Sequence, residues 1–169
     1  MPNKKRGASA PQFKVIKMPK LDEIKHYRNP IPTTDIFIEY DNGRKKGIVL
    51  IKRKNPPRGY ALPGGFAEYG ITLEDNARKE AKEETNLAVE LENPGKPLVF
   101  SKPDRDPRGH MITSVYIAEG KGELKAGDDA KDADVYTIKE ILHMLGMNQF
   151  AFDHEQIIVE CLKQKGYIK

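Results

Sequence analysis

Residues 64–87 read GGFAEYGITLEDNARKEAKEETNL and carry the strongest structural signal in the chain. It opens with Gly64 and Gly65, and a glycine pair lets the backbone turn tightly and approach a ligand closely. Good helix formers run from residue 73 to residue 85, and Thr72 stands where an N-cap is needed. The stretch therefore predicts a tight glycine loop that leads into a helix.

Three carboxylates lie on one face of that predicted helix. Glu80, Glu83 and Glu84 have the i, i+3 and i+4 spacing that brings side chains together. Because like charges at this spacing repel, a hard divalent cation with oxygen ligands would stabilise the cluster. The basic neighbours of these residues also fit an ordinary solvated face, which is the commoner use of a helix rich in Glu and Lys. The helix alone leaves both interpretations open.

The rest of the chain predicts more strands than helices. Strands are expected over residues 33–40, 47–53, 60–62, 87–91, 98–101, 110–119 and 135–138, and helices over residues 141–145 and 152–165. In the first strand, Ile36 and Ile38 alternate with Phe37, which predicts that the two sets face opposite sides of the sheet. A turn signal at residues 41–43 joins the first two strands as a hairpin. This order predicts an α/β (α+β) sandwich with a mixed sheet, and not a doubly wound nucleotide fold.

The basic charge of the chain is concentrated at its start. Residues 1–28 carry a net charge of +6 and the remainder carries −2. Residues 1–32 also hold five prolines, so we expect a basic N-terminal arm, with at most a short strand near residues 13–18, followed by one domain over residues 33–169. The arm lacks interleaved aromatic residues and a nucleic-acid-binding motif, so nucleic acid is not an expected partner.

Other features of the composition predict a cytoplasmic protein. No apolar run approaches the roughly 20 residues of a membrane-spanning helix, and the start lacks the apolar middle of a secretory signal. The lone cysteine, Cys161, excludes an internal disulfide and a cysteine-based zinc site. It stands among aliphatic residues at helical spacing, so we expect a buried core thiol.

Residues 64–87 resemble the Nudix box, the sequence signature of the Nudix hydrolase superfamily. The pattern of that box is G-x5-E-x7-R-E-U-x-E-E-x-G-U, in which U is an aliphatic residue. Aligning its first glycine on Gly65 places the three helical carboxylates on the family's metal-binding glutamates and Leu87 on the last aliphatic position. The resemblance implies an α/β/α sandwich with a mixed central sheet and helices on both faces.

The chain departs from the family pattern at three positions. Ile71 stands in place of the first glutamate, Lys79 in place of the arginine, and Asn86 in place of the last glycine. Asn tolerates the left-handed conformation that the end of a helix often needs. Ile71 and Lys79 cannot form the carboxylate–guanidinium pair that braces loop and helix in the family. We therefore expect the metal site to form without this brace, and a binding role without turnover remains an alternative.

Motifs outside the box point to one branch of the superfamily. Residues 103–110 (PDRDPRGH), 127–130 (GDDA) and 151–154 (AFDH) resemble motifs of the ADP-ribose pyrophosphatases and of related ADP-ribose-sensing regulators. Those regulators carry a winged-helix domain after the Nudix domain, and we expect none after Lys169. The resemblance implies Mg²⁺-dependent hydrolysis of ADP-ribose to AMP and ribose 5-phosphate, with Mn²⁺ able to replace Mg²⁺. The substrate class is a nucleoside diphosphate sugar.

The resemblance also implies roles for particular residues. The expected metal ligands are the Gly64 carbonyl and the side chains of Glu80, Glu83 and Glu84. The expected substrate contacts are Arg53, Gly65, Arg105, Arg108 and His110, with His154 as a further candidate. Asp129 is the preferred general base, and Asp128 and Glu155 are the alternatives. A homodimer and a hydrolase for another nucleoside diphosphate derivative are also compatible with the sequence.

Overall fold

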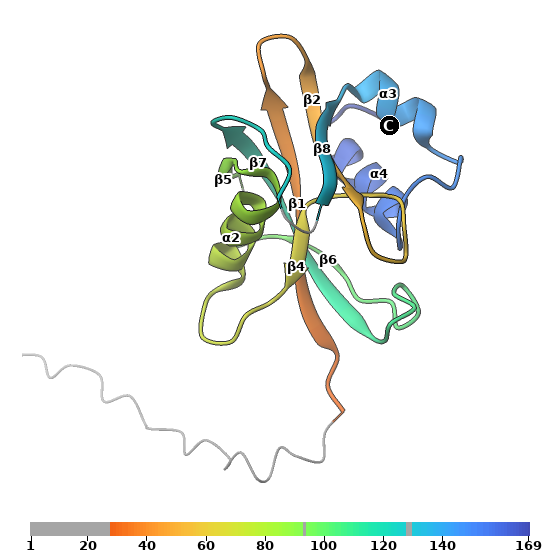
Figure 1. The fold of residues 1–169 in the computed structure, drawn as a ribbon. Coiled ribbons are helices and arrows are strands. Elements are labelled where there is room, and N and C mark those ends of the chain that lie inside the picture. Colours follow the sequence, from red (N-terminus) through yellow and green to blue (C-terminus); the bar gives the residue numbers. More distant parts are fainter. Residues whose placement is uncertain (1–27, 93, 128–129) are drawn as a thin grey trace, which may run out of the picture.

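The computed structural model describes residues 28–92, 94–127 and 130–169. These residues form a sheet that is covered by helices (Figure 1). The strands are β1 (Ile31–Asp41), β2 (Lys46–Arg53), β3 (Tyr60–Ala61), β4 (Gly64–Phe66), β5 (Ala88–Leu91), β6 (Leu98–Phe100), β7 (Met111–Lys121) and β8 (Ala130–Tyr136). The helices are α2 (Leu73–Thr85), α3 (Ile138–Met144) and α4 (His154–Gln164). The strand expected near residues 13–18 lies outside the described residues.

The sheet is mixed, as the sequence predicts. Its main path runs β3-β2-β1-β7-β5, and β4, β6 and β8 pair with β1, β7 and β2 respectively. β1 and β7 are parallel neighbours, whereas every other pairing is antiparallel. The long strand β1 is therefore the centre of the molecule, with pairings along both of its edges.

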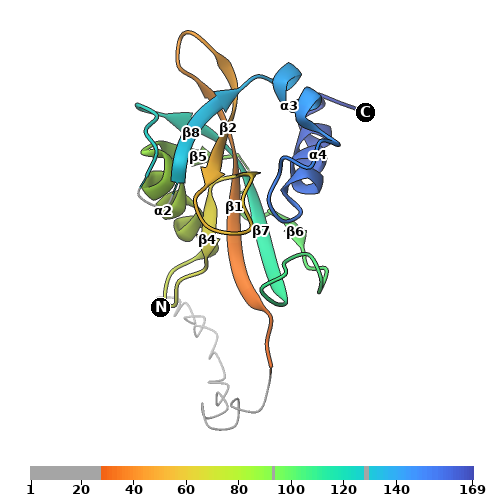
Figure 2. The same ribbon diagram turned by 45° about the vertical axis from the view of Figure 1, so that its right-hand side comes forward.

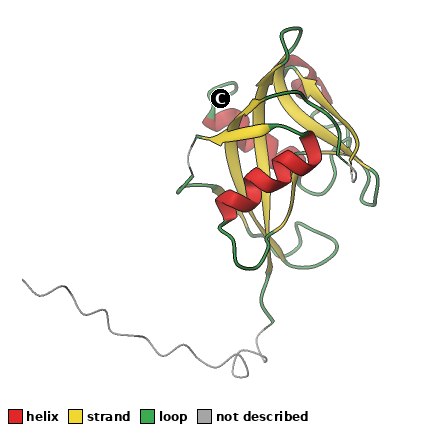
Figure 3. Ribbon diagram, turned by 60° about the vertical axis from the view of Figure 1, so that its left-hand side comes forward, coloured by secondary structure: helices red, strands yellow, loops and turns green. Residues whose placement is uncertain are grey.

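Helices cover both faces of the sheet, which confirms the predicted sandwich. α2 lies on one face, and α3 and α4 lie on the other (Figures 2 and 3). The core is divided in the same way, because Ile36 and Ile38 pack with the alanines of α2 while Phe37 packs with Ile157 and other side chains of α4. The predicted alternation in this strand is confirmed, since successive side chains of a strand point to opposite faces.

Helix α2 begins and ends where the sequence predicts. The Thr72 side chain accepts a hydrogen bond from the backbone N–H of Asp75 at 3.1 Å, which satisfies one of the free donors at the start of the helix. At the other end Asn86 adopts the left-handed conformation with φ of 60°, and its N–H donates to the Lys82 carbonyl. Local capping thus fixes the length of the helix that carries the three carboxylates.

The prediction that the glycine pair forms only a turn is wrong. Gly64 and Gly65 belong to β4, which pairs antiparallel with β1 so that Asp35 faces Gly64 and Thr33 faces Phe66. An added Cβ at Gly64 would lie 2.2 Å from the Thr34 carbonyl oxygen. The strand is thus possible because a residue without a side chain allows the two backbones to approach closely.

Three elements begin two or more residues earlier than predicted. The largest difference is in strand β8, which begins at Ala130 instead of residue 135 because its pairing with β2 extends to Arg53. Helix α3 begins at Ile138, three residues early, because Thr137 and Glu140 form a capping box with reciprocal hydrogen bonds. Strand β1 begins at Ile31, two residues before the predicted domain boundary. Cys161 is fully buried in the core, as expected. No helix among the described residues has the length and apolar character needed to cross a membrane.

Candidate active site

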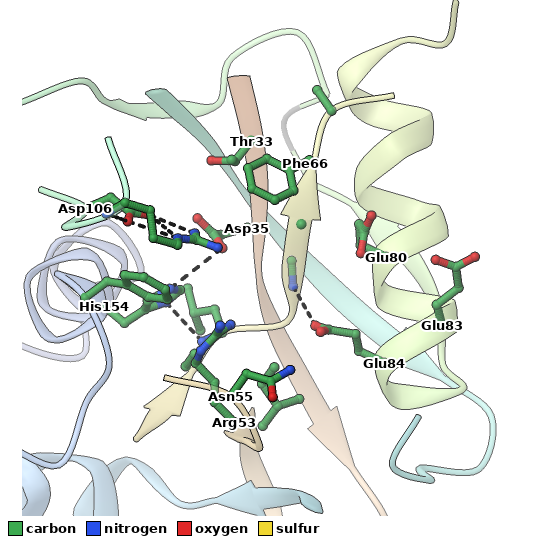
Figure 4. A pocket seen from close by; sticks show the side chains of 18 of the residues that line it. Thr33, Asp35, Arg53, Asn55, Phe66, Glu80, Glu83, Glu84, Asp106 and His154 are labelled. Atoms are coloured by element: carbon green, nitrogen blue, oxygen red, sulfur yellow. Dashed lines mark hydrogen bonds and ion pairs between the residues drawn. The ribbon is translucent and has the colours of Figure 1, made fainter. Parts of the chain in front are cut away.

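A polar cavity of about 540 Å³ lies between the carboxylate face of α2 and the start of α4 (Figure 4). Strand β4 and the β1 residues beside it form its floor. The residues that line it with charged or aromatic side chains are Asp35, Arg53, Lys54, Phe66, Glu68, Glu80, Glu83, Glu84, Arg105, Asp106, Arg108, Phe152 and His154. This volume is typical of a pocket for a small-molecule ligand.

Two of the three clustered glutamates of α2, Glu80 and Glu84, are partly buried in this cavity. Glu84 is largely buried, and its Oε2 atom accepts a hydrogen bond from the backbone N–H of Gly64 at 2.8 Å. Burial raises the pKa of Glu84 to about 7, and burial likewise raises the pKa of Glu80. Both carboxylates therefore lie in a site where their negative charge is destabilised, which is a physical reason for a cation to bind there.

The third glutamate of the cluster, Glu83, also lines the cavity, but its carboxylate is bound to Lys79. The Glu83 carboxylate lies 2.7 Å from the Lys79 ammonium, on the outer side of the helix in Figure 4. Among the described residues, no group of three or more His, Cys, Asp or Glu side chains converges closely enough to hold a metal ion. The role of Glu83 as a metal ligand stays a prediction, and it would require the side chain to leave Lys79.

A loop-to-helix ion pair is present, although the sequence predicts its loss. The Lys79 ammonium lies 3.1 Å from the Glu68 carboxylate, which comes from the loop between β4 and α2. Glu83 and Glu68 together raise the pKa of Lys79. Ile71, at the family's glutamate position, is instead partly exposed. Matching by spacing misses the pair because the partner lies three residues earlier in the loop.

Arginines form the opposite wall of the cavity. The Arg105 side chain is only 5% exposed and donates two hydrogen bonds, of 2.8 and 2.7 Å, to the Asp153 carboxylate. Arg108 is held by Asp106 in the same bidentate way and reaches the aromatic rings of the pocket. Each guanidinium is thereby fixed in direction, and only the N–H groups outside its bidentate pair remain to bind another anion.

Arg53 lies between the two walls. Its guanidinium carbon lies 4.8 Å from the centre of the Phe152 ring, and its Nε–H donates to the Pro57 carbonyl. The positive charge of Arg53 acts to lower the pKa of Glu84, although burial of that carboxylate has the larger effect. Among the arginines of the cavity, Arg53 therefore has the electrostatic interaction with the Glu84 carboxylate.

Several cavity residues were not predicted from the sequence. Asp35, Phe66, Asp106 and Phe152 line the pocket, and none of them had a predicted role. Phe66, Asp106 and Phe152 lie inside the resembled motifs, whereas Asp35 lies in none of them. One signal was available for Asp35, because it is an acidic residue at the start of an apolar strand. Acidic side chains are rarely buried without a partner.

Two predicted site residues, His110 and Glu155, do not line the cavity. His110 lies with its Nε2 atom 3.1 Å from the Ser101 carbonyl, and Glu155 accepts a hydrogen bond from the Gly146 N–H. Asp129 lies outside the described residues. Gly127, the last described residue before this gap, lies against α2, where its N–H donates to the Glu84 carbonyl at 2.9 Å. The roles of these residues stay predictions.

The raised pKa of Glu84 makes the stability of the metal-free protein depend on pH. The folded protein keeps the Glu84 proton to a higher pH than the unfolded chain, so stability is lost as the pH rises from 4.5 to about 7. We expect up to about 3 kcal/mol lower stability at pH 8 than at pH 5 from this group. Chemical denaturation in EDTA at both values measures it. A Glu84→Gln variant with the same pH dependence would contradict the assignment.

The comparisons with known proteins agree with this geometry. The ADP-ribose pyrophosphatase of Methanocaldococcus jannaschii is 44% identical over 158 residues, which are 90% of this chain and 85% of that protein. The crystal structure of a bifunctional NMN adenylyltransferase/ADP ribose pyrophosphatase from Francisella tularensis, complexed with AMP and a manganese ion, superposes with a TM-score of 0.68 at 27% identity. That match covers 86% of this chain and 44% of the Francisella chain.

Another solved structure supports the fold alone, because its sequence identity is low. The NUDIX domain of Shewanella oneidensis NrtR, complexed with ADP ribose, has a TM-score of 0.68 at 21% identity, and the match covers 87% of this chain and 99% of that one. The family model described as the NUDIX domain matches residues 30–158, which include every described residue of the cavity. The chain belongs to the NUDIX domain family.

Proposed function

We propose that this protein hydrolyses the diphosphate bond of ADP-ribose to AMP and ribose 5-phosphate, with Mg²⁺ as the activating ion. One observation carries the proposal, which is that Glu80 and Glu84 line the same cavity as Arg53 and Arg108. A diphosphate needs both walls, because arginines bind phosphate oxygens and carboxylates hold a hard divalent ion. The identity with the ADP-ribose pyrophosphatase of M. jannaschii supports the choice of substrate.

The donor set fits a divalent ion. Glu80 and Glu84 offer carboxylate oxygens with raised pKa values in one cavity, and the Gly64 carbonyl is the proposed third ligand. When bound, the ion neutralises phosphate oxygens and activates a water molecule for attack. Oxygen ligands together with substrate phosphates are the environment that Mg²⁺ prefers, and Mn²⁺ is the proposed substitute.

The residues of the chain supply binding and orientation. Arg53 and Arg108 hold the diphosphate by charge-assisted hydrogen bonds, and Arg105 fixes the 101–109 loop to α4 through Asp153. Water attacks one phosphorus atom, and the bond from that phosphorus to the bridging oxygen breaks. Asp129 is our proposed general base, supported by the packing of Gly127 on the last turn of α2.

A turnover assay tests the proposal directly. Purified protein is incubated with ADP-ribose and Mg²⁺, and AMP and ribose 5-phosphate are quantified by chromatography. We expect both products in equal amounts and none when EDTA is added. Tight binding of ADP-ribose without product would instead favour the alternative, a nucleotide-binding module without turnover. Products only from another substrate of a nucleoside diphosphate panel would reassign the specificity.

The ion pair between Glu68 and Lys79 removes one reason for the inactive alternative, which was the expected lack of a link between loop and helix. The pair is largely exposed, and exposed pairs contribute little. We therefore expect Glu68→Gln to lower kcat by less than about fivefold. Steady-state kinetics measure this, with Asp104→Asn as a surface control. A loss of a hundredfold or more would mean that Glu68 acts in the chemistry itself.

The cytoplasmic location and the homodimer stay predictions. We propose both on the sequence features described above and on the resemblance to the ADP-ribose pyrophosphatase branch. Light scattering coupled to size exclusion measures the oligomeric state of the full chain. A monomer at micromolar concentration would remove the homodimer.

A further inference from the structure

Two buried polar residues at the floor of the cavity have no role in the proposed chemistry. The Asp35 side chain is 12% exposed and the His154 side chain 6% exposed, and both line the cavity. Asp35 lies in β1 and His154 at the start of α4, so 119 residues of sequence separate two side chains that point toward one another (Figure 4). Burying such groups is costly unless they have partners, which makes their arrangement informative.

Each of the two side chains is held in place from behind. The Thr113 hydroxyl donates to Asp35 Oδ2 at 2.6 Å, which leaves Oδ1 as the atom directed at His154. The Leu62 backbone N–H donates to His154 Nδ1 at 3.1 Å, so the ring proton must be on Nε2. Burial lowers the pKa of His154, which keeps the ring neutral with one donor. A fixed acceptor therefore faces a fixed donor.

The two facing atoms are too far apart to bond to one another. Asp35 Oδ1 and His154 Nε2 are separated by 3.9 Å, beyond the range of a hydrogen bond. Among the described residues no fully buried side-chain nitrogen or oxygen lacks a hydrogen-bond partner. Because Asp35 Oδ1 and His154 Nε2 have no such partner, neither atom is fully buried, and both must border the open cavity. A single atom about 2.8 Å from each of them would bridge the gap.

The chemistry of the bridging group follows from the two atoms. It must accept a hydrogen bond from Nε2–H and donate one to a carboxylate oxygen. A phosphate oxygen accepts only and is repelled by Asp35, and an ammonium group donates only, whereas a hydroxyl does both. Asp35 also faces Gly64, whose N–H binds Glu84, so the gap lies close to the carboxylates of α2. A sugar hydroxyl next to the diphosphate is the group that fits.

We propose that Asp35 and His154 form a hydroxyl-binding subsite that holds a ribose of the substrate beside the diphosphate. The identity of the sugar rests on the proposed function, and the subsite makes Asp35 and His154 specificity-determining residues of that reaction. Binding through this hydroxyl fixes the position of the neighbouring phosphate relative to Glu80 and Glu84. The subsite would discriminate against sugars that lack the hydroxyl, because the carboxylate and the imidazole would then remain unpaired.

A binding cycle between protein and ligand tests the subsite without requiring turnover. Calorimetry in EDTA measures the affinity of the wild type and of Asp35→Asn for ADP-ribose and for analogues deoxygenated on the adenosine ribose or on the terminal ribose. We expect Asp35→Asn to weaken ADP-ribose binding about 10- to 100-fold, because a neutral amide then replaces the charged acceptor of the hydroxyl. For the analogue that lacks the recognised hydroxyl, the same substitution should change affinity less than about twofold.

The analogue for which the effect disappears identifies the ribose. An undiminished effect of Asp35→Asn on every analogue overturns the proposal, and so does equal affinity of wild type and variant for ADP-ribose; either result leaves only a structural pair with a water between the residues. Asp104→Asn serves as the exposed control and should leave all affinities unchanged. If Asp35→Asn fails to fold, Thr113→Val, which releases the Asp35 carboxylate, replaces it in the same cycle.

The outcome is separable from that of the turnover assay. If the binding cycle identifies one hydroxyl but the protein shows no turnover, the subsite is supported and the proposed hydrolase activity is rejected. If the protein hydrolyses ADP-ribose but no analogue removes the effect of Asp35→Asn, the hydrolase activity is supported and the subsite is rejected. In an active protein, a second readout is a rise of KM for ADP-ribose that exceeds the fall of kcat.

Discussion

Replacing Glu84 by glutamine should lower kcat for ADP-ribose by about three orders of magnitude, the largest effect that we expect from a single substitution. Glu84 combines deep burial, a hydrogen bond from the Gly64 N–H and a pKa of about 7. Glutamine keeps the shape and can still accept the hydrogen bond from Gly64. It removes the negative charge that would hold the divalent ion, so binding of the substrate should be retained while turnover is lost.

The contrast with Glu83 makes this result specific. Glu83→Gln changes the same functional group one residue earlier on the helix, but that carboxylate is bound to Lys79 and lies on the outer side. We expect a loss of only about tenfold. Steady-state kinetics at several Mg²⁺ concentrations measure both variants. Equal losses in the two would mean that Glu83 leaves Lys79 and becomes a metal ligand of the same weight.

A single added methyl group should have the second largest effect. A Cβ at Gly65 would lie 2.6 Å from a carboxylate oxygen of Glu80, closer than real contacts allow. The obstructing atoms are the far end of a flexible side chain, so Gly65→Ala should fold with nearly unchanged stability. The Glu80 carboxylate must move, however, and we expect kcat to fall at least about a hundredfold because a metal ligand is displaced.

Two other glycines provide the controls for this experiment. Gly64→Ala meets backbone atoms of Thr34 and Asp35 that cannot move independently, so it should lower the thermal unfolding temperature as well as activity. Gly95 has open space around its Cα and no left-handed φ, so Gly95→Ala should change neither. Thermal unfolding and kinetics are measured on all three. A Gly65→Ala variant with wild-type activity would show that Glu80 is not needed where it now lies.

Local sequence signals predicted the helix of the site well. The length of α2 depends on helix propensity and on Thr72 and Asn86, each of which caps only the turn next to it. The same holds for the opposite facing of Ile36 and Phe37, because side-chain alternation is a property of the strand itself. The glycine pair was predicted incorrectly since its strand exists only through pairing with β1, a contact between segments thirty residues apart.

Most of the residues with a predicted role line the cavity, including Arg53, Arg105, Arg108 and His154, but their contacts with one another were not predicted. The carboxylates of α2 follow from spacing along one helix, whereas Asp35 and His154 meet only after β1 and α4 have been folded together. The pairing of Lys79 with Glu68 was missed for a different reason. A fixed spacing pattern names one loop position, but a lysine side chain reaches several, and the loop conformation selects among them.

The contact of the β7–β8 connection with α2 limits how this part of the chain can change in length. The Lys125 N–H donates to the Thr85 carbonyl, the Gly127 N–H donates to that of Glu84, and a Cβ at Gly127 would collide with the Glu83 carbonyl. An insertion between residues 122 and 127 would shift this register and tilt the end of the helix. Loop grafting or domain insertion should therefore leave these residues intact and use the hairpin at residues 42–45, which packs on no part of the cavity.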